Sequence, residues 1–80
     1  MNRKAASVLR WVFQKGDKSL TCLLQRSGAD SSYDICVVPH WDVTSAVVEE
    51  TETPIRAFCR HAEIALALRT AGWSVVERSR

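Results

Sequence analysis

The longest regular segment of the chain lies between residues 53 and 73 and predicts an α-helix. Thr53 suits the N-cap position, and Pro54 suits the first helical position because its missing N–H would have no partner there. Gly72 suits the left-handed residue that often follows a helix. We therefore expect one long helix that begins after Thr53 and ends just before Gly72.

Projected at about 100° per residue, this helix carries two apolar stripes on nearly opposite sides. We expect the first stripe to face a sheet; it contains Ile55, Phe58, Cys59, Ala62 and Leu66. The second stripe contains Ala57, His61, Ile64 and Leu68. A helix on one sheet needs one apolar face, so the second stripe is a candidate contact with a second copy or a partner helix. The N-terminal segment or the chain after Gly72 could instead cover it, or its side chains could stay exposed.

Shorter segments alternate between apolar and polar positions with a period of two, which is typical of strands. The segment Lys15-Gly16-Asp17-Lys18 predicts a turn between the first two of them. The last segment is either a short strand or an extended tail on the helix. The fold class is then α+β: a four-stranded antiparallel meander, one long C-terminal helix on one face, and a short terminal strand. The expected strands are residues 8–14, 19–26, 33–39, 43–50 and 73–77.

The composition supports one small globular domain spanning residues 1–80, with 1–7 and 78–80 frayed. The 80 residues are 46% hydrophobic and 25% charged. No apolar run approaches the roughly 20 residues of a membrane span, and none follows the basic start as in a signal peptide. We therefore expect a cytoplasmic protein that does not enter a membrane. Three cysteines without paired spacing argue against a disulfide framework, and the small size favours self-association.

Charge is unevenly distributed along the chain. Residues 1–26 contain six Lys/Arg against one Asp, and the remainder contains five Lys/Arg and eight Asp/Glu. A basic sheet surface with an exposed aromatic ring could bind single-stranded nucleic acid weakly through phosphate contacts and base stacking. The candidate residues are Arg3, Lys4, Arg10, Lys15, Lys18, Arg26 and, for stacking, Trp41.

Metal and catalytic sites are not expected. Cys59 and His61 lie two residues apart on the predicted helix, about 200° around its axis, so they cannot converge on one ion. The one local grouping suited to nucleophilic catalysis is Cys36, His40 and Asp42, but Cys36 is expected inside a strand and no Gly-rich turn accompanies it. We therefore expect a noncatalytic protein without a cofactor or a bound metal.

Two short motifs resemble those of a group of small uncharacterised bacterial proteins. Trp11, Phe13, Lys15 and Gly16 form W-x-F-x-K-G, and residues 68–74 read L-R-T-A-G-W-S. In that group the first motif opens a β-hairpin and a late helix ends in T-G-W-S. The resemblance implies a strand meander followed by a helix, and it implies no activity.

Together these features predict a noncatalytic protein-interaction module, homodimeric through the second stripe at Ala57, His61, Ile64 and Leu68. The alternative is a weak single-stranded nucleic-acid binder that uses the basic N-terminal hairpin.

Overall fold

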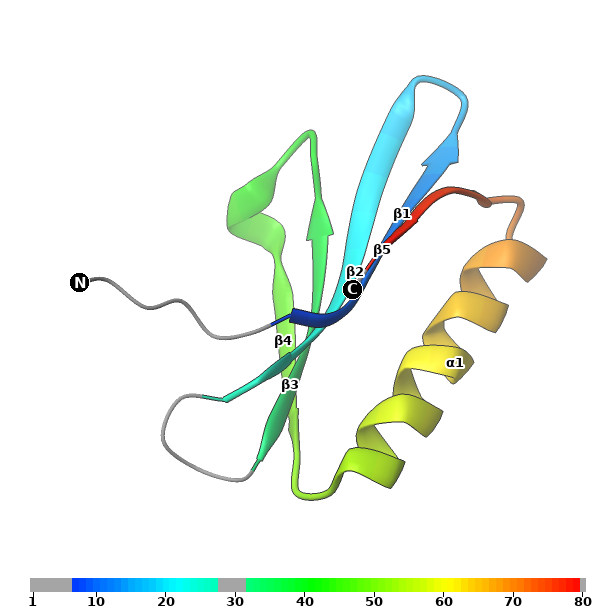
Figure 1. The fold of residues 1–80 in the computed structure, drawn as a ribbon. Coiled ribbons are helices and arrows are strands. Elements are labelled where there is room, and N and C mark those ends of the chain that lie inside the picture. The colour runs from blue at the N-terminus through cyan, green and yellow to red at the C-terminus, as the bar shows by residue number, and fades with distance from the viewer. Residues whose placement is uncertain (1–6, 28–31, 80) are drawn as a thin grey trace.

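The computed structural model describes residues 7–27 and 32–79, which form a five-stranded antiparallel sheet with one helix on one face (Figure 1). The expected α+β class with an antiparallel sheet and one helix is confirmed. The terminal strand, however, is a full member of the sheet. The elements are β1 (Ser7–Lys15), β2 (Lys18–Arg26), β3 (Tyr33–Pro39), the 3₁₀ turn η1 (Val43–Ser45), β4 (Val47–Thr51), α1 (Pro54–Thr70) and β5 (Ser74–Ser79).

The sheet has the strand order β4-β3-β2-β1-β5, so the first four strands form a meander and β5 joins its far edge. Lys15 pairs with Lys18 across a two-residue turn, where Gly16 takes a φ of 63° that a side chain would disfavour. The chain leaves β4 at one edge, crosses the sheet as α1, and returns as β5 beside β1. The helix therefore covers one face of the whole sheet (Figure 1).

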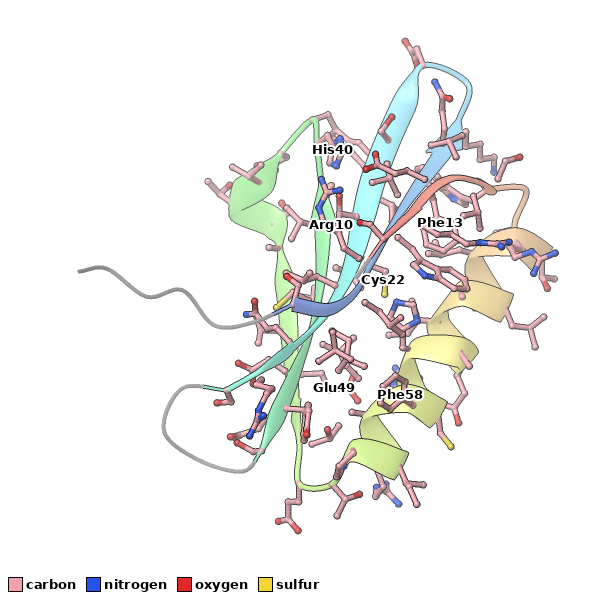
Figure 2. The ribbon with its side chains drawn as sticks, in the orientation of Figure 1. Arg10, Phe13, Cys22, His40, Glu49 and Phe58 are labelled. Atoms are coloured by element: carbon pink, nitrogen blue, oxygen red, sulfur yellow. The ribbon has the colours of Figure 1, made fainter. Side chains whose placement is uncertain are left out.

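The core lies between α1 and the sheet. The alternation of β1, β2 and β3 sends every second side chain toward the helix, and β2, at the centre of the sheet, is the most buried strand. Figure 2 shows Phe13 and Cys22 directed toward α1, while Arg10 and His40 lie on the other side. The core residues are Phe13, Leu20, Cys22, Leu24, Ile35, Ala57 and Ala65.

Both predicted ends of α1 are confirmed in detail. The Thr53 hydroxyl accepts a hydrogen bond from the Arg56 N–H at 3.2 Å. At the other end, the N–H of Trp73 donates to the Leu68 carbonyl and that of Gly72 to the Arg69 carbonyl, with Gly72 at a φ of 101°. This pair of bonds is a Schellman motif, which satisfies the last carbonyls of the helix.

The two stripes of α1 face opposite to our expectation. Ala57 and His61 are buried at 0% and 2% exposure, and Ile64 and Leu68 pack against the core beside them. The first stripe, which was expected to face the sheet, lies on the solvent side, and Ile55 is 75% exposed. The second stripe is therefore covered by the sheet of its own chain, so its four residues cannot serve as the predicted dimer contact.

Small side chains explain the reversal. Ala57 and Ala65 flank His61 by one turn on either side, so the helix backbone can approach the sheet closely along this line. His61 fills the middle, with Nε2 3.4 Å from the Cys22 carbonyl oxygen and its ring edge-on to Trp11 at 5.2 Å between centroids. The sequence projection favoured the stripe with larger side chains, whereas close packing favours the one that lets the backbones approach.

Two further expectations are corrected. Residues 43–45 form a 3₁₀ turn instead of the start of a strand, because the Asp42 carboxylate accepts hydrogen bonds from the hydroxyls of Thr44 and Ser45, both at 2.6 Å. At the C-terminus, Arg78 and Ser79 belong to β5 and are paired with β1, so they are not frayed. Ser7, expected to be frayed, belongs to β1 and pairs with Gln25. Residues 1–6 and 80, also expected to be frayed, lie outside the described residues.

No helix in the described part of the chain is long and apolar enough to span a membrane. The sheet face opposite α1 has no described helix or strand over it (Figure 1). On this face, Arg10 forms an ion pair with Glu77 at 3.2 Å, and the His40 ring is 2.7 Å from the Thr21 hydroxyl. Polar side chains thus shield part of the apolar surface of this face.

We expect the burial of His61 to make stability depend on pH. Burial lowers the pKa of His61 below its ordinary 6.5, against a smaller opposing effect of the Cys22 carbonyl. As the pH drops below about 6.5, His61 of the unfolded chain becomes protonated more readily than the buried His61 of the folded chain. The free energy of unfolding should therefore fall over this pH range. Urea unfolding at several pH values would measure this. A His61→Gln variant should show a flatter profile; parallel profiles for the two proteins would contradict the assignment.

We also expect the three cysteines to react at very different rates. Cys59 is exposed on α1, whereas Cys22 and Cys36 are buried. Burial raises the pKa of Cys22 to about 11 and also raises the pKa of Cys36, so neither forms much thiolate at neutral pH. With a chromogenic thiol reagent, one thiol per native chain should react quickly and the others only on unfolding. Cys59→Ser should abolish the fast phase, and a second fast thiol in that variant would contradict the structure.

Candidate functional site

One candidate site is the exposed apolar stripe of α1, which we call the helix seam and define as Ile55, Cys59, Ala62 and Leu66. All four residues lie on the solvent side of the helix, and Leu66 is 66% exposed. Phe58, 43% exposed, borders the seam and extends its apolar surface. Figure 2 places Phe58 on the helix, one turn after its start. The seam is the longest exposed apolar row that a single described element presents.

Charged residues line one flank of the seam. Arg56 and Glu63 lie on this flank, and Arg60, beside them, bonds Glu49 of β4 and Glu63, both at 3.1 Å. These two carboxylates raise the pKa of Arg60, so its charge is permanent. A hollow of about 300 Å³ between α1 and β4 contains these groups. Because its central polar atoms already pair with each other, we interpret the hollow as the border of the seam, not as a ligand pocket.

A second candidate site lies at the end of the sheet nearest the C-terminus of α1. Here Trp73 precedes β5, Lys15 ends β1, Lys18 begins β2, and Trp41 follows β3. The two indole rings stack with 6.2 Å between their centroids and 15° between their planes. We call this cluster the basic-aromatic end; it consists of Lys15, Lys18, Trp41, Arg69, Trp73 and Arg78.

The lysines of this end contact the aromatic and helical groups around them. Lys18 Nζ lies 5.1 Å from the centroid of the Trp41 ring, a cation–π distance. Lys15 Nζ donates to the Ala71 carbonyl at 2.7 Å, next to Gly72, where an added Cβ would lie 3.3 Å from the Lys15 side chain. Lys15 thereby joins the turn between β1 and β2 to the end of the helix.

Two arginines extend the same end toward the edge of the sheet. Arg69 and Arg78 line a shallow hollow of about 400 Å³ with Trp73, Ser74 and Val75. Arg78 also lies over the Trp11 ring, with its guanidinium carbon 5.0 Å from the centroid. The lining therefore combines one indole with two guanidinium groups, a combination suited to a planar group that carries an anion.

The structure brings together only part of the predicted nucleic-acid set. Lys15, Lys18 and Trp41 meet at the basic-aromatic end. Arg10 lies on the opposite face of the sheet, paired with Glu77, and Arg26 lies at the other end of β2 from Lys18. Arg3 and Lys4 lie outside the described residues. Arg10 and Arg26 therefore lie apart from the cluster of Lys15, Lys18 and Trp41.

Trp73, Arg69 and Arg78 are the residues of this end that the sequence did not assign to it. A signal existed in the two short motifs, K-G at Lys15-Gly16 and G-W at Gly72-Trp73. The structure joins them through the Lys15 bond to Ala71 and through the pairing of Gln14 with Ser74. Trp73 is partly buried against the core, and its ring also stacks on the exposed Trp41.

The residues once considered for metal or nucleophile chemistry are dispersed. Cys36 lies in β3 with Gln25 Nε2 3.9 Å from its sulfur, and His40 contacts Thr21. Cys59 is on the solvent side of α1 and His61 is in the core. Among residues 7–27 and 32–79, no group of three potential metal ligands lies close enough together to hold an ion.

Comparison with known proteins adds no assignment: no protein-family model matches the chain, and no curated protein and no solved structure is significantly similar to it.

Proposed function

We propose that this protein is a noncatalytic interaction module that forms a homodimer through the helix seam. The observation that carries the proposal is the exposure of Ile55 and Leu66, at 75% and 66%, on a helix whose opposite side already forms the core. Burying each of these side chains would contribute roughly 1.5 to 3 kcal/mol. The partner surface must then be apolar and elongated, as a second helix is.

The spacing of the seam fits helix-to-helix packing. Its members are separated by four, three and four residues, the spacing that keeps a row of side chains facing a neighbouring helix. Large side chains occupy the ends, at Ile55 and Leu66, and small ones occupy the middle, at Cys59 and Ala62. Small central residues allow two helix backbones to approach closely.

The seam is complementary to itself in an antiparallel arrangement. If two copies of α1 pair around a two-fold axis between Cys59 and Ala62, Ile55 of each chain faces Leu66 of the other. Cys59 then faces Ala62 in the same way, so each large side chain meets a large one and each small side chain a small one. A two-fold contact of one surface with itself is the commonest dimer geometry, which favours a second copy as the partner.

The charged flank supports the same arrangement. Arg56 and Glu63 lie on one side of the seam, and the two-fold axis places this side of one chain beside the same side of the other. Arg56 of each chain then lies near Glu63 of the other, which gives two attractive pairs. A parallel arrangement has its two-fold axis along the helices and would place the charged flanks on opposite sides of the contact, so Arg56 of one chain would not meet Glu63 of the other.

The extent of the contact sets its strength. The 17 residues of α1 span about 25 Å, so a single helix pair buries a small area compared with a stable protein–protein interface. Exposed ion pairs such as Arg56 with Glu63 add on the order of 0.5 kcal/mol each. We therefore expect a reversible dimer with a dissociation constant on the order of micromolar.

The first test compares two substitutions in the same turn of α1. Leu66→Asp places a charge in the seam and should convert the dimer to a monomer, because that carboxylate would be desolvated in the contact. Ala67→Asp places the same charge one residue later, on an exposed position outside the seam, and should leave the dimer intact. Sedimentation velocity over a range of concentrations would measure both. A wild type that stays monomeric at high micromolar concentration would refute the dimer.

The second test addresses the antiparallel register. Ile55→Lys and Leu66→Glu should each weaken the dimer alone, because each sets a charge against an apolar side chain. An equimolar mixture of the two variants should associate more strongly than either, since the new lysine of one chain then faces the new glutamate of the other. Sedimentation of the separate and mixed variants provides the comparison.

Parallel pairing would place position 55 opposite position 55, so mixing would then create no lysine–glutamate pair. A mixture that associates no better than its components would therefore contradict the antiparallel arrangement. A mixture of Ile55→Lys with Leu66→Gln serves as the control, because the amide carries no charge for the lysine to pair with, and it should gain nothing.

A further inference from the structure

We propose that the basic-aromatic end binds single-stranded nucleic acid, with bases stacking on Trp41 and Trp73 and phosphates held by Lys18, Arg69 and Arg78. The inference does not rest on the homodimer, because none of these residues belongs to the helix seam. Lys18, Trp41, Arg69 and Trp73 lie at the end of α1 and of the sheet, and Arg78, which pairs with Trp11, lines the same hollow as Trp73. The partner class follows from the order of the side chains across the sheet.

The sheet arranges these residues in one row. Across β5, β1, β2 and β3, in that spatial order, the strand ends supply Trp73, Lys15, Lys18 and Trp41. Adjacent strand ends are about 4.8 Å apart, but the Trp73 and Trp41 rings stack with 6.2 Å between their centroids, so the side chains form a compact cluster. Arg69 and Arg78 continue it around Trp73 on the side of β5. The result is a pair of stacked indole rings with cationic groups around it, a site of the size of one or two nucleotides.

A single strand fits this row better than a duplex. Trp41 is 52% exposed, and its ring together with that of Trp73 forms a short aromatic platform. Stacking on such a platform requires an unpaired base, since the faces of duplex bases are already stacked. No described helix protrudes at this end in a way that would enter a major groove, because α1 ends here and lies flat on the sheet (Figure 1).

The charges of the molecule separate along α1. Near the basic-aromatic end the acidic groups are Asp17 and Asp42, and they are outnumbered by the four cations Lys15, Lys18, Arg69 and Arg78. Asp42 keeps its charge, because the hydroxyls of Ser45 and Thr44 lower its pKa. The opposite end, where the helix begins, contains the acidic group of Glu49, Glu50 and Glu52 around a shallow hollow. A polyanion would therefore be attracted to one end of the protein and repelled from the other.

The experiment uses the full chain and a fluorescein-labelled oligothymidylate, with binding followed by anisotropy at salt concentrations between roughly 50 mM and 200 mM. With three phosphate contacts, the slope of log K against log salt should be about −2. Trp41→Leu should weaken binding between roughly five- and 100-fold, because it removes a stacking surface. Lys18→Gln should weaken binding and make the slope about 0.7 less steep.

Arg26→Gln is the matched control, because Arg26 is a cation at the other end of β2 from Lys18. It should leave both the affinity and the slope unchanged. Thermal unfolding of each variant checks folding, and quenching of tryptophan fluorescence by the oligonucleotide in the wild type reports stacking without any substitution. The Leu66→Asp variant should still bind, which separates this site from the dimer contact.

Three results would overturn the proposal. The first is an absence of salt-sensitive binding at low salt. The second is equal weakening by Arg26→Gln and Lys18→Gln, which would indicate attraction without a defined site. The third is binding that survives Trp41→Leu unchanged, shows no quenching, and is matched by heparin, because a polyanion without bases cannot stack.

Discussion

The contact of α1 with the sheet through His61 is the interaction on which the rest of the structure depends. One imidazole fills the space between two alanines, packs edge-on against Trp11, and lies against the Cys22 carbonyl in the central strand. A smaller side chain would leave a void between the helix and the sheet, and a larger one would push the helix away from the sheet. The position of α1, and with it the identity of every exposed residue on the helix, follows from this packing.

The position of the helix in turn decides which surfaces remain for partners. With Ala57, His61 and Ala65 against the sheet, the row from Ile55 to Leu66 faces solvent. In a chain of 80 residues, where only about 60 to 65% of the unfolded surface can be buried, such an apolar row has no place in the core. The partner that we propose for this row is a second copy of the chain, because the spacing and the charges of the row fit an antiparallel pair.

The C-terminal end of α1 positions the residues of the basic-aromatic end. The Schellman motif turns the chain at Gly72 and directs Trp73 back toward the sheet, where its ring meets that of Trp41. Lys15 bonds the Ala71 carbonyl and so fixes the β1–β2 turn to the same point. Three segments distant in the sequence thereby converge, and their cations are concentrated at one end. The two surfaces lie on different parts of α1, so dimer formation and nucleic-acid binding would not compete for the same residues.

Local chemistry in the sequence determined the elements and most of their limits. Thr53, Pro54 and Gly72 defined the ends of α1, the K-G-D-K turn defined the first hairpin, and Pro39 the end of β3, because each acts through its own backbone. The turn at residues 43–45 was missed because Val43 and Thr44 favour strands, and the hydroxyl bonds to Asp42 outweigh that preference.

Only the tertiary structure decided which side of α1 is buried. Both stripes are apolar. Periodicity alone cannot show which of them lets the helix backbone approach the sheet closely and which only contains larger side chains. The tertiary structure also decided where the basic residues lie. They follow one another along one hairpin in the sequence, but the alternation of β1 places Arg10 on the sheet face away from α1. The length of β2 places Arg26 at the other end of that strand from Lys18. Which residues the chain exposes to a partner therefore depends on long-range packing, whereas its strands, turns and helix ends follow from the local sequence.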